Sequence, residues 1–279
     1  MTNFNKLLDE YILLGMRTGF FDHKVAENIV SRIREIEVIE DNTIRGDART
    51  TMDGGRQIIL LNKDKCSSKG EYYGDEVIFH ELSHFSNDIH RDLYVYRKSD
   101  IKEFSSANKS LSEGNPLVRF PEWGMFLLDE VISQITAEAM VKAKYGSEVD
   151  GIYKEELFMT EYTEPPVLLS TKITDYRDCY SLANDFSRTI YHGDDTITKM
   201  CIDAYNNSLL DRVFSKFGSR ENGTKELYEL LGYMGNILIK IYEEKYGFSF
   251  KGSEPNKDKK LILTSMRRAK DIANSIASE

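Results

Sequence analysis

Two histidines and a glutamate in the segment HELSH, residues 80–84, form the pattern with the clearest chemistry in this sequence. His80 and His84 are four residues apart, so on an α-helix they lie one turn apart on the same face. Two imidazoles placed in this way can bind one zinc ion together. Glu81 follows the first histidine, where its carboxylate can accept a proton from a water molecule that zinc acidifies. The spacing predicts a hydrolytic zinc site with His80 and His84 as ligands and Glu81 as general base.

Chance is a poor explanation of this pattern. With 5 His and 46 Asp plus Glu among 279 residues, a random order would produce His-acid-x-x-His roughly 0.015 times. The flanking residues are also suitable for a buried helix, because Val77, Phe79 and Leu82 are apolar and Ser83 is small. The alternative is an ordinary core helix whose two histidines serve only as hydrogen-bonding side chains.

The segment EVIFHELSH, residues 76–84, resembles the active-site helix of the zincin metallopeptidases. The resemblance covers about residues 44–140, roughly a third of the chain. It implies a small sheet beside the active-site helix and hydrolysis of peptide bonds. In zincins, the edge strand just before this helix holds an extended substrate, so the resemblance assigns that role to GGRQIILLN, residues 54–62.

A catalytic zinc ion is expected to have three protein ligands and one open position. The segment LLDEVISQITAEA, residues 127–139, is similar to the second ligand helix of the gluzincins, and this match implies that Glu130 is the third ligand. Ser133 and Gln134 follow one turn later on the same side. Gln134 stands where many gluzincins have an acid that orients a histidine, and its amide oxygen could accept an imidazole N–H. The alternative is that Glu130 lies at the solvated edge of an amphipathic helix.

A metzincin-like arrangement is the rival, with His90 as the third ligand. The segment HELSHFSNDIH, residues 80–90, fits H-E-x-x-H-x-x-G-x-x-H except that Asn87 replaces the glycine. That glycine adopts a left-handed conformation, for which asparagine is the next-best residue. Metzincins also have a methionine-containing turn beneath the metal, and Met125 is the candidate here. Otherwise His90 is a surface residue near a helix end.

An oxyanion that develops during hydrolysis usually needs a hydrogen-bond donor besides the metal. Tyr162 and His192 are possible donors. The sequence has 16 tyrosines, so a single choice among them has little support.

Apolar spacing and turn residues predict an α+β fold with most of its strands near the N-terminus. Two short strands flank the hairpin signal Asp53-Gly54-Gly55, at residues 44–51 and 56–62. A polar loop at 63–70 precedes the HELSH helix, which is expected to open near Gly74. The other expected helices span residues 4–17, 22–37, 122–143, 225–246 and 261–278. We expect a zincin-like region with a small sheet and the active-site helix at 1–145, followed by a mostly helical region at 146–279.

Composition narrows the range of partners and compartments. The net charge of −9 argues against general binding to nucleic acid or to an anionic membrane surface. No run of eighteen apolar residues is present, and the N-terminal segment is a poor signal peptide. Three widely spaced cysteines favour a reducing compartment, so a cytoplasmic location is expected. An effector exported without a cleaved signal would look the same.

The sequence therefore predicts a zinc metallopeptidase that acts on a peptide or protein, with Zn²⁺ held by His80, His84 and Glu130. A second hypothesis is a sensor or partner-binding protein on a zincin scaffold, or an effector-like protease of a single target, with little general peptidase activity.

Overall fold

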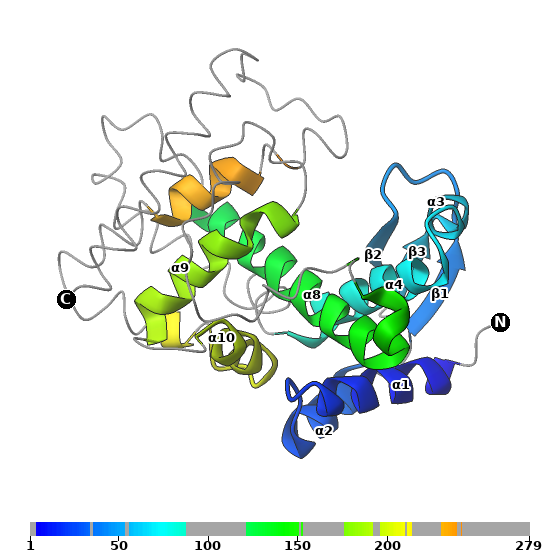
Figure 1. Cartoon of the computed structure of the whole chain (residues 1–279), viewed down its shortest axis with the longest axis horizontal. Helices are drawn as coiled ribbons and strands as arrows, with labels where there is room; N and C mark the ends of the chain where they lie inside the picture. Colours follow the sequence, from blue (N-terminus) through cyan, green and yellow to red (C-terminus); the bar gives the residue numbers. More distant parts are fainter. Residues whose placement is uncertain are drawn as a thin grey trace, which may run out of the picture. The chain divides into compact units, whose positions relative to one another are not determined.

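The computed structural model describes elements from α1 to α10 and a later helical stretch, coloured along the chain in Figure 1. It describes residues 4–33, 36–53, 56–87, 121–150, 152, 176–191, 196–209, 211–213, 230–238 and 241. The described residues of 1–87, 132–157 and 201–206 form one compact unit, and the others form a second. The division at residue 145 expected from the sequence stays a prediction.

Two helices, α1 (Phe4–Arg17) and α2 (His23–Arg32), open the first unit. The predicted helix at 4–17 is confirmed. One face of α1 is buried and carries the apolar residues Leu7, Leu8, Tyr11 and Leu14. Gly15 is required on this helix, because a Cβ atom there would lie 1.9 Å from the ring of Phe21. The absence of a side chain lets Phe21 fold back onto α1.

The strands β1 (Ile36–Glu40), β2 (Ala48–Asp53) and β3 (Arg56–Leu61) form one sheet in the order β1-β3-β2. β2 pairs antiparallel with β3 and ends at the pair Asp53↔Arg56, so the predicted hairpin is confirmed. β1 pairs parallel with β3 and was missed. The helix expected at 22–37 ends at Arg32 instead.

The central position of β3 corrects one expectation. β3 is paired with β1 along one side and with β2 along the other. Its backbone N–H and C=O groups are therefore occupied in the sheet, and β3 cannot add an extended substrate as a further strand. The resemblance had assigned this role to residues 54–62. Within the described part of the chain, the outer edges of this sheet belong to β1 and β2.

A buried asparagine links the end of β3 to the next helix. Asn62 caps the short helix α3 (Lys63–Ser67), because its side chain accepts a hydrogen bond from the backbone N–H of Lys65. Its amide nitrogen also donates to the carbonyl oxygen of Ile44 at 3.1 Å. One side chain thus holds both the start of α3 and the connection between β1 and β2. The predicted polar loop at 63–70 is therefore partly helical.

The helix that carries the HELSH segment is α4 (Glu71–Ser86), which begins three residues before the predicted start near Gly74. It contacts β2, β3 and α3 (Figure 1). Every residue from 79 to 87 is buried, including the polar ones. The C-terminal half of α4 therefore lies in the interior of the first unit, and the histidines, Glu81 and the serines of this half are held away from bulk water.

The longest described helix is α8 (Pro121–Tyr145), which confirms the helix predicted at 122–143. All residues from 131 to 141 are buried. The C-terminal end of α8 is tied to the first turns of α4, because the hydroxyl of Tyr145 donates to Asp75 Oδ2 at 2.7 Å. Lys144 Nζ lies 2.6 Å from the same carboxylate and 3.0 Å from that of Glu10 on α1. These polar contacts fix the ends of both helices within the first unit.

The described C-terminal residues are mostly helical, as predicted. They include η5 (Tyr176–Cys179), α9 (Tyr180–Tyr191), α10 (Thr196–Tyr205) and helical residues 230–238. Gly124 of α8 lets the last stretch approach closely, since a Cβ atom there would lie 2.3 Å from the carbonyl oxygen of Leu231. The helix predicted at 261–278 lies outside the described residues.

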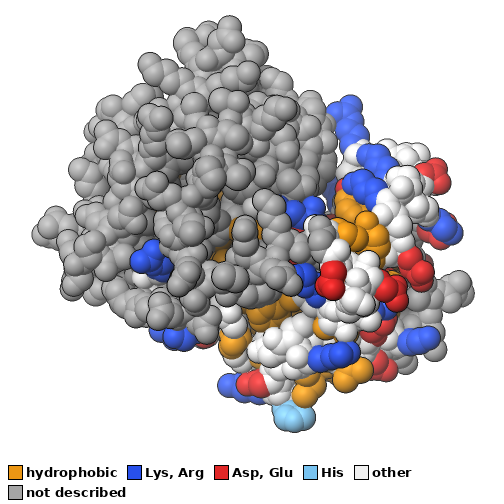
Figure 2. Space-filling view, viewed as in Figure 1, with side chains coloured by type: hydrophobic (Ala, Val, Ile, Leu, Met, Phe, Trp, Pro, Cys, Tyr) orange, Lys and Arg blue, Asp and Glu red, His pale blue; other side chains and the backbone are white. Residues whose placement is uncertain are grey.

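The chain is thus a mixed α+β protein with more helix than strand and one small sheet. None of the helices that the structure describes combines the length and the apolar character needed to cross a bilayer. On the face shown in Figure 2, the acidic and basic side chains of the described residues are interspersed.

Candidate metal centre

The two histidines of the HELSH segment face one another on α4. They lie one helical turn apart, and their Nε2 atoms are 3.1 Å from each other. The ring centroids are 4.8 Å apart, with an angle of 83° between the ring planes. Both side chains are largely buried, at 8% and 5% exposure for His80 and His84. The predicted convergence of two imidazoles on one point is therefore present.

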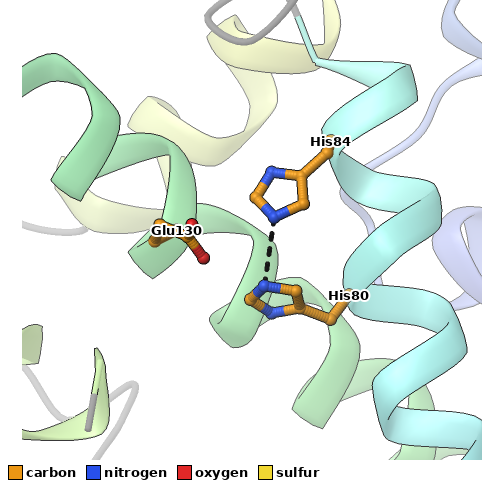
Figure 3. A group of neighbouring side chains, drawn as sticks. All are labelled: His80, His84 and Glu130. Carbon is orange, nitrogen blue, oxygen red and sulfur yellow. Dashed lines mark hydrogen bonds between the residues drawn. The ribbon is translucent and has the colours of Figure 1, made fainter. Parts of the chain in front are cut away.

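Glu130 joins this pair from α8. One ligand atom from each of His80, His84 and Glu130 lies within 4.8 Å of the other two. Figure 3 shows both imidazoles projecting from α4, with the Glu130 carboxylate beside them. Glu130 is half-buried, whereas the histidines are buried. The three residues that the sequence nominated as metal ligands are thus brought together in space.

The geometry of the two imidazoles fits a tetrahedral cation. Zinc–nitrogen bonds of about 2.0–2.1 Å place two nitrogen ligands about 3.3 Å apart, close to the 3.1 Å between the Nε2 atoms. A carboxylate oxygen of Glu130 lies within 4.8 Å of a ring nitrogen of each histidine. Two imidazoles and one carboxylate are a known catalytic zinc set, and they also suit other first-row divalent metals.

A serine on α8 contacts the other ring nitrogen of one candidate ligand, His84. Ser133 Oγ lies 3.3 Å from Nδ1 of His84, and the Ser133 side chain is fully buried. Ser133 is three residues after Glu130, so one turn of α8 carries both the candidate carboxylate ligand and a hydroxyl group that contacts a candidate imidazole ligand. The sequence placed Ser133 on the correct side of the helix but gave it no role.

Gln134 has a different environment from the expected one. Its amide nitrogen donates to Glu76 Oε1 at 2.7 Å and to Glu138 Oε1 at 3.1 Å. Both carboxylates are at least 96% buried, and a buried carboxylate is stable only when hydrogen-bonded or paired. The amide nitrogen of Gln134 therefore bridges one acid of α4 and one acid of α8. Nδ1 of His84 contacts the hydroxyl of Ser133.

Glu81, the expected general base, is buried at 9% exposure. It follows His80 on α4 and is turned about 100° from it around the helix axis. Its carboxylate is therefore largely shielded from bulk water.

A cluster of four buried hydroxyl groups lies on a neighbouring face of α4. Ser83 Oγ is 3.2 Å from the hydroxyl of Tyr11 and 3.0 Å from that of Tyr205. The Tyr205 hydroxyl also contacts Thr136 Oγ1 at 2.8 Å. Burial raises the pKa of Tyr11 to about 12 and raises that of Tyr205 well above its usual value. Both phenols are therefore neutral hydrogen-bonding groups that connect α1, α4, α8 and α10.

The sequence offered no means of finding Tyr205 in this cluster. It is 122 residues from Ser83 and one of 16 tyrosines, so only the tertiary structure distinguishes it.

Two features expected for the metzincin-like alternative, a left-handed Asn87 and a methionine-containing turn at Met125, are absent from the described residues. Asn87 ends α4 with φ −86° and ψ 161°, which is extended and not left-handed. Its side-chain nitrogen donates to the carbonyl oxygen of Ser83 at 3.0 Å. Met125 lies within α8 and is buried, so it does not form a methionine-containing turn. His90 itself lies outside the described residues, as do Tyr162 and His192.

Comparisons of the chain with protein-family models, with characterised proteins and with solved structures give no significant match.

Proposed function

We propose that this chain is a zinc-dependent metallopeptidase of zincin type, with gluzincin-like ligands. The observation that carries the proposal is the convergence of His80, His84 and Glu130 from two helices, with their ligand atoms within 4.8 Å of one another. Two further features support it. Glu81 stands beside the first histidine, and the helix that carries both contacts a small sheet.

In the proposed mechanism His80, His84 and Glu130 would hold the metal ion. A bound zinc ion would polarise the scissile carbonyl group and make the attacking water more acidic. The carboxylate of Glu81 would act as general base toward the attacking water, and it would then return the proton to the nitrogen of the leaving amine.

The decisive experiment compares Glu81→Gln with His84→Ala. Glu81→Gln keeps the shape of the side chain but removes the base, so hydrolysis should fall by about 10²- to 10⁴-fold while zinc stays bound. His84→Ala should lose both zinc and hydrolysis. Zinc content is measured by elemental analysis, and activity with casein and with a peptide library.

Glu76→Gln is the matched control, because it makes the same change in a buried glutamate of α4. Its new amide can still accept the hydrogen bond from Gln134, so zinc content and activity should be retained. The proposal fails if purified wild-type chain neither contains nor takes up stoichiometric zinc, or if Glu81→Gln remains fully active. Zinc binding without cleavage in either assay would favour the sensor or single-target hypothesis instead.

A further inference from the structure

In a metal-binding imidazole, one ring nitrogen binds the cation, and it can do so only if the proton of the ring is on the other nitrogen. A neutral histidine has one ring N–H, and Nε2 can bind a cation only when the proton is on Nδ1. In this site the Nε2 atoms of both histidines face each other beside Glu130. The Nδ1–H group of His84, inside a helix interior, then needs an acceptor from the protein.

Ser133 Oγ is in place to accept that proton. It lies 3.3 Å from His84 Nδ1, and both side chains are at least 95% buried. The serine is fixed by its position inside α8, where all residues from 131 to 141 are buried. Its oxygen therefore meets the imidazole with little access for water.

We propose that Ser133 is a positioning residue of the metal centre, which holds His84 as the Nδ1–H tautomer and directs its Nε2 lone pair at the cation. This inference rests on the proposed metal site. It also assigns a donor and an acceptor to the contact between the two Nε2 atoms. When His84 is protonated at Nδ1, its Nε2 can only accept, so His80 donates from Nε2–H across the 3.1 Å contact. The two neighbouring histidines then have opposite tautomers.

The first test uses the metal-free protein. Nitrogen-15 NMR of the histidine rings distinguishes Nδ1–H from Nε2–H in each residue, with His80→Ala and His84→Ala used to assign the signals. In the wild-type chain we expect Nδ1–H at His84 and Nε2–H at His80. In Ser133→Ala the population of His84 with Nδ1–H should fall. An Nε2–H tautomer at His84 in the wild-type chain would overturn the proposal.

The second test measures zinc affinity by competition with a chelator. Loss of a partner of a ligating histidine typically weakens binding 10- to 100-fold, and we expect a loss in that range for Ser133→Ala. Ser133→Thr keeps a hydroxyl group at the same position and should recover most of the affinity. Ser187→Ala on α9 is the control, because it removes another fully buried serine hydroxyl, one that donates to the carbonyl oxygen of Asn184. It should leave zinc binding unchanged.

The two tests separate this inference from the proposed function. If the wild-type chain does not bind zinc, the proposed function fails, but the tautomer of His84 and its dependence on Ser133 can still be measured. If the wild-type chain binds zinc and Ser133→Ala binds it equally tightly with an unchanged His84 tautomer, Ser133 has no positioning role. Circular dichroism of Ser133→Ala checks that the helices are intact, and Ser133→Thr keeps the question testable if the alanine variant does not fold.

Discussion

Glu130 differs from the two histidines because it belongs to another helix and is half-buried. Its carboxylate lies near the imidazoles because α8 packs beside α4. His80 and His84 lie close together because they are one turn apart on the same helix. Asn87 is extended, so the structure gives no support to the left-handed turn that a His90 ligand would need. The ligand set of two histidines and one glutamate is thus the one that the described residues support.

Replacement of Glu130 tests the third ligand directly. We expect Glu130→Ala to weaken zinc binding at least about 100-fold, because loss of a ligand should exceed the 10- to 100-fold effect of an outer hydrogen-bonding partner. His90→Ala should bind zinc as the wild-type chain does. Both affinities are measured by chelator competition, with His23→Ala, an exposed histidine at the start of α2, as control. The reverse pattern, with strong loss only in His90→Ala, would favour the metzincin-like arrangement.

At the scale of elements, α4 is held in place by polar contacts as well as by apolar packing. The Tyr205 hydroxyl contacts Ser83 on α4 and Thr136 on α8, and all three side chains are fully buried. Gln134 makes a second link between the same two helices through Glu76. Each buried hydrogen bond forms only when its two partners face each other. These bonds therefore favour one rotation of α4 about its own axis relative to α8. That rotation places the histidines beside Glu130.

Removal of the Tyr205 hydroxyl should weaken this link. In Tyr205→Phe two buried hydroxyl groups lose a partner, which should reduce the free energy of unfolding by about 1–3 kcal/mol. Urea unfolding followed by circular dichroism measures this change. Tyr72→Phe, a half-buried tyrosine on α4, is the control and should differ from the wild-type chain by no more than about 0.5 kcal/mol. An equal loss in both variants would mean that the hydroxyl cluster makes no special contribution.

At the scale of the whole molecule, a bound metal would couple its site to folding. The proposed ligands come from residues 80–84 and from α8, so the complete set would exist only in the folded chain. A cation that binds only the folded chain increases the free energy of unfolding. The increase grows with the logarithm of the ratio between the free cation concentration and the dissociation constant of the cation.

Zinc should therefore raise the melting temperature of the wild-type chain. At a free zinc concentration of 100 times the dissociation constant, the gain is about 2.7 kcal/mol, which corresponds to a shift of about 5–10 °C for a domain of 150–250 residues. A thermal melt with and without zinc measures the shift, and a chelator should reverse it. His84→Ala should show little shift. An equal shift in that variant would show that zinc binds elsewhere on the chain.

The sequence by itself determined those features that depend on neighbouring residues. The convergence of His80 and His84 follows from the repeat of one α-helix, and the β2–β3 hairpin follows from Asp53-Gly54-Gly55. Helices α1 and α8 were predicted within two residues at each end, since their apolar spacing is continuous. Glu130 was nominated through a family resemblance, and the fold brought it to the histidines.

Only the tertiary structure decided the features that depend on distant partners. β1 follows residues with helical spacing, and its pairing with β3 makes Ile36–Glu40 a strand. The same pairing makes β3 central, which removes its expected role as an edge for substrate. Ser133 and Tyr205 acquire their contacts from helices 49 and 122 residues away in sequence. The spacing of residues along the sequence determines on which face of a helix a side chain lies. The packing of the folded chain determines which distant residues contact that face.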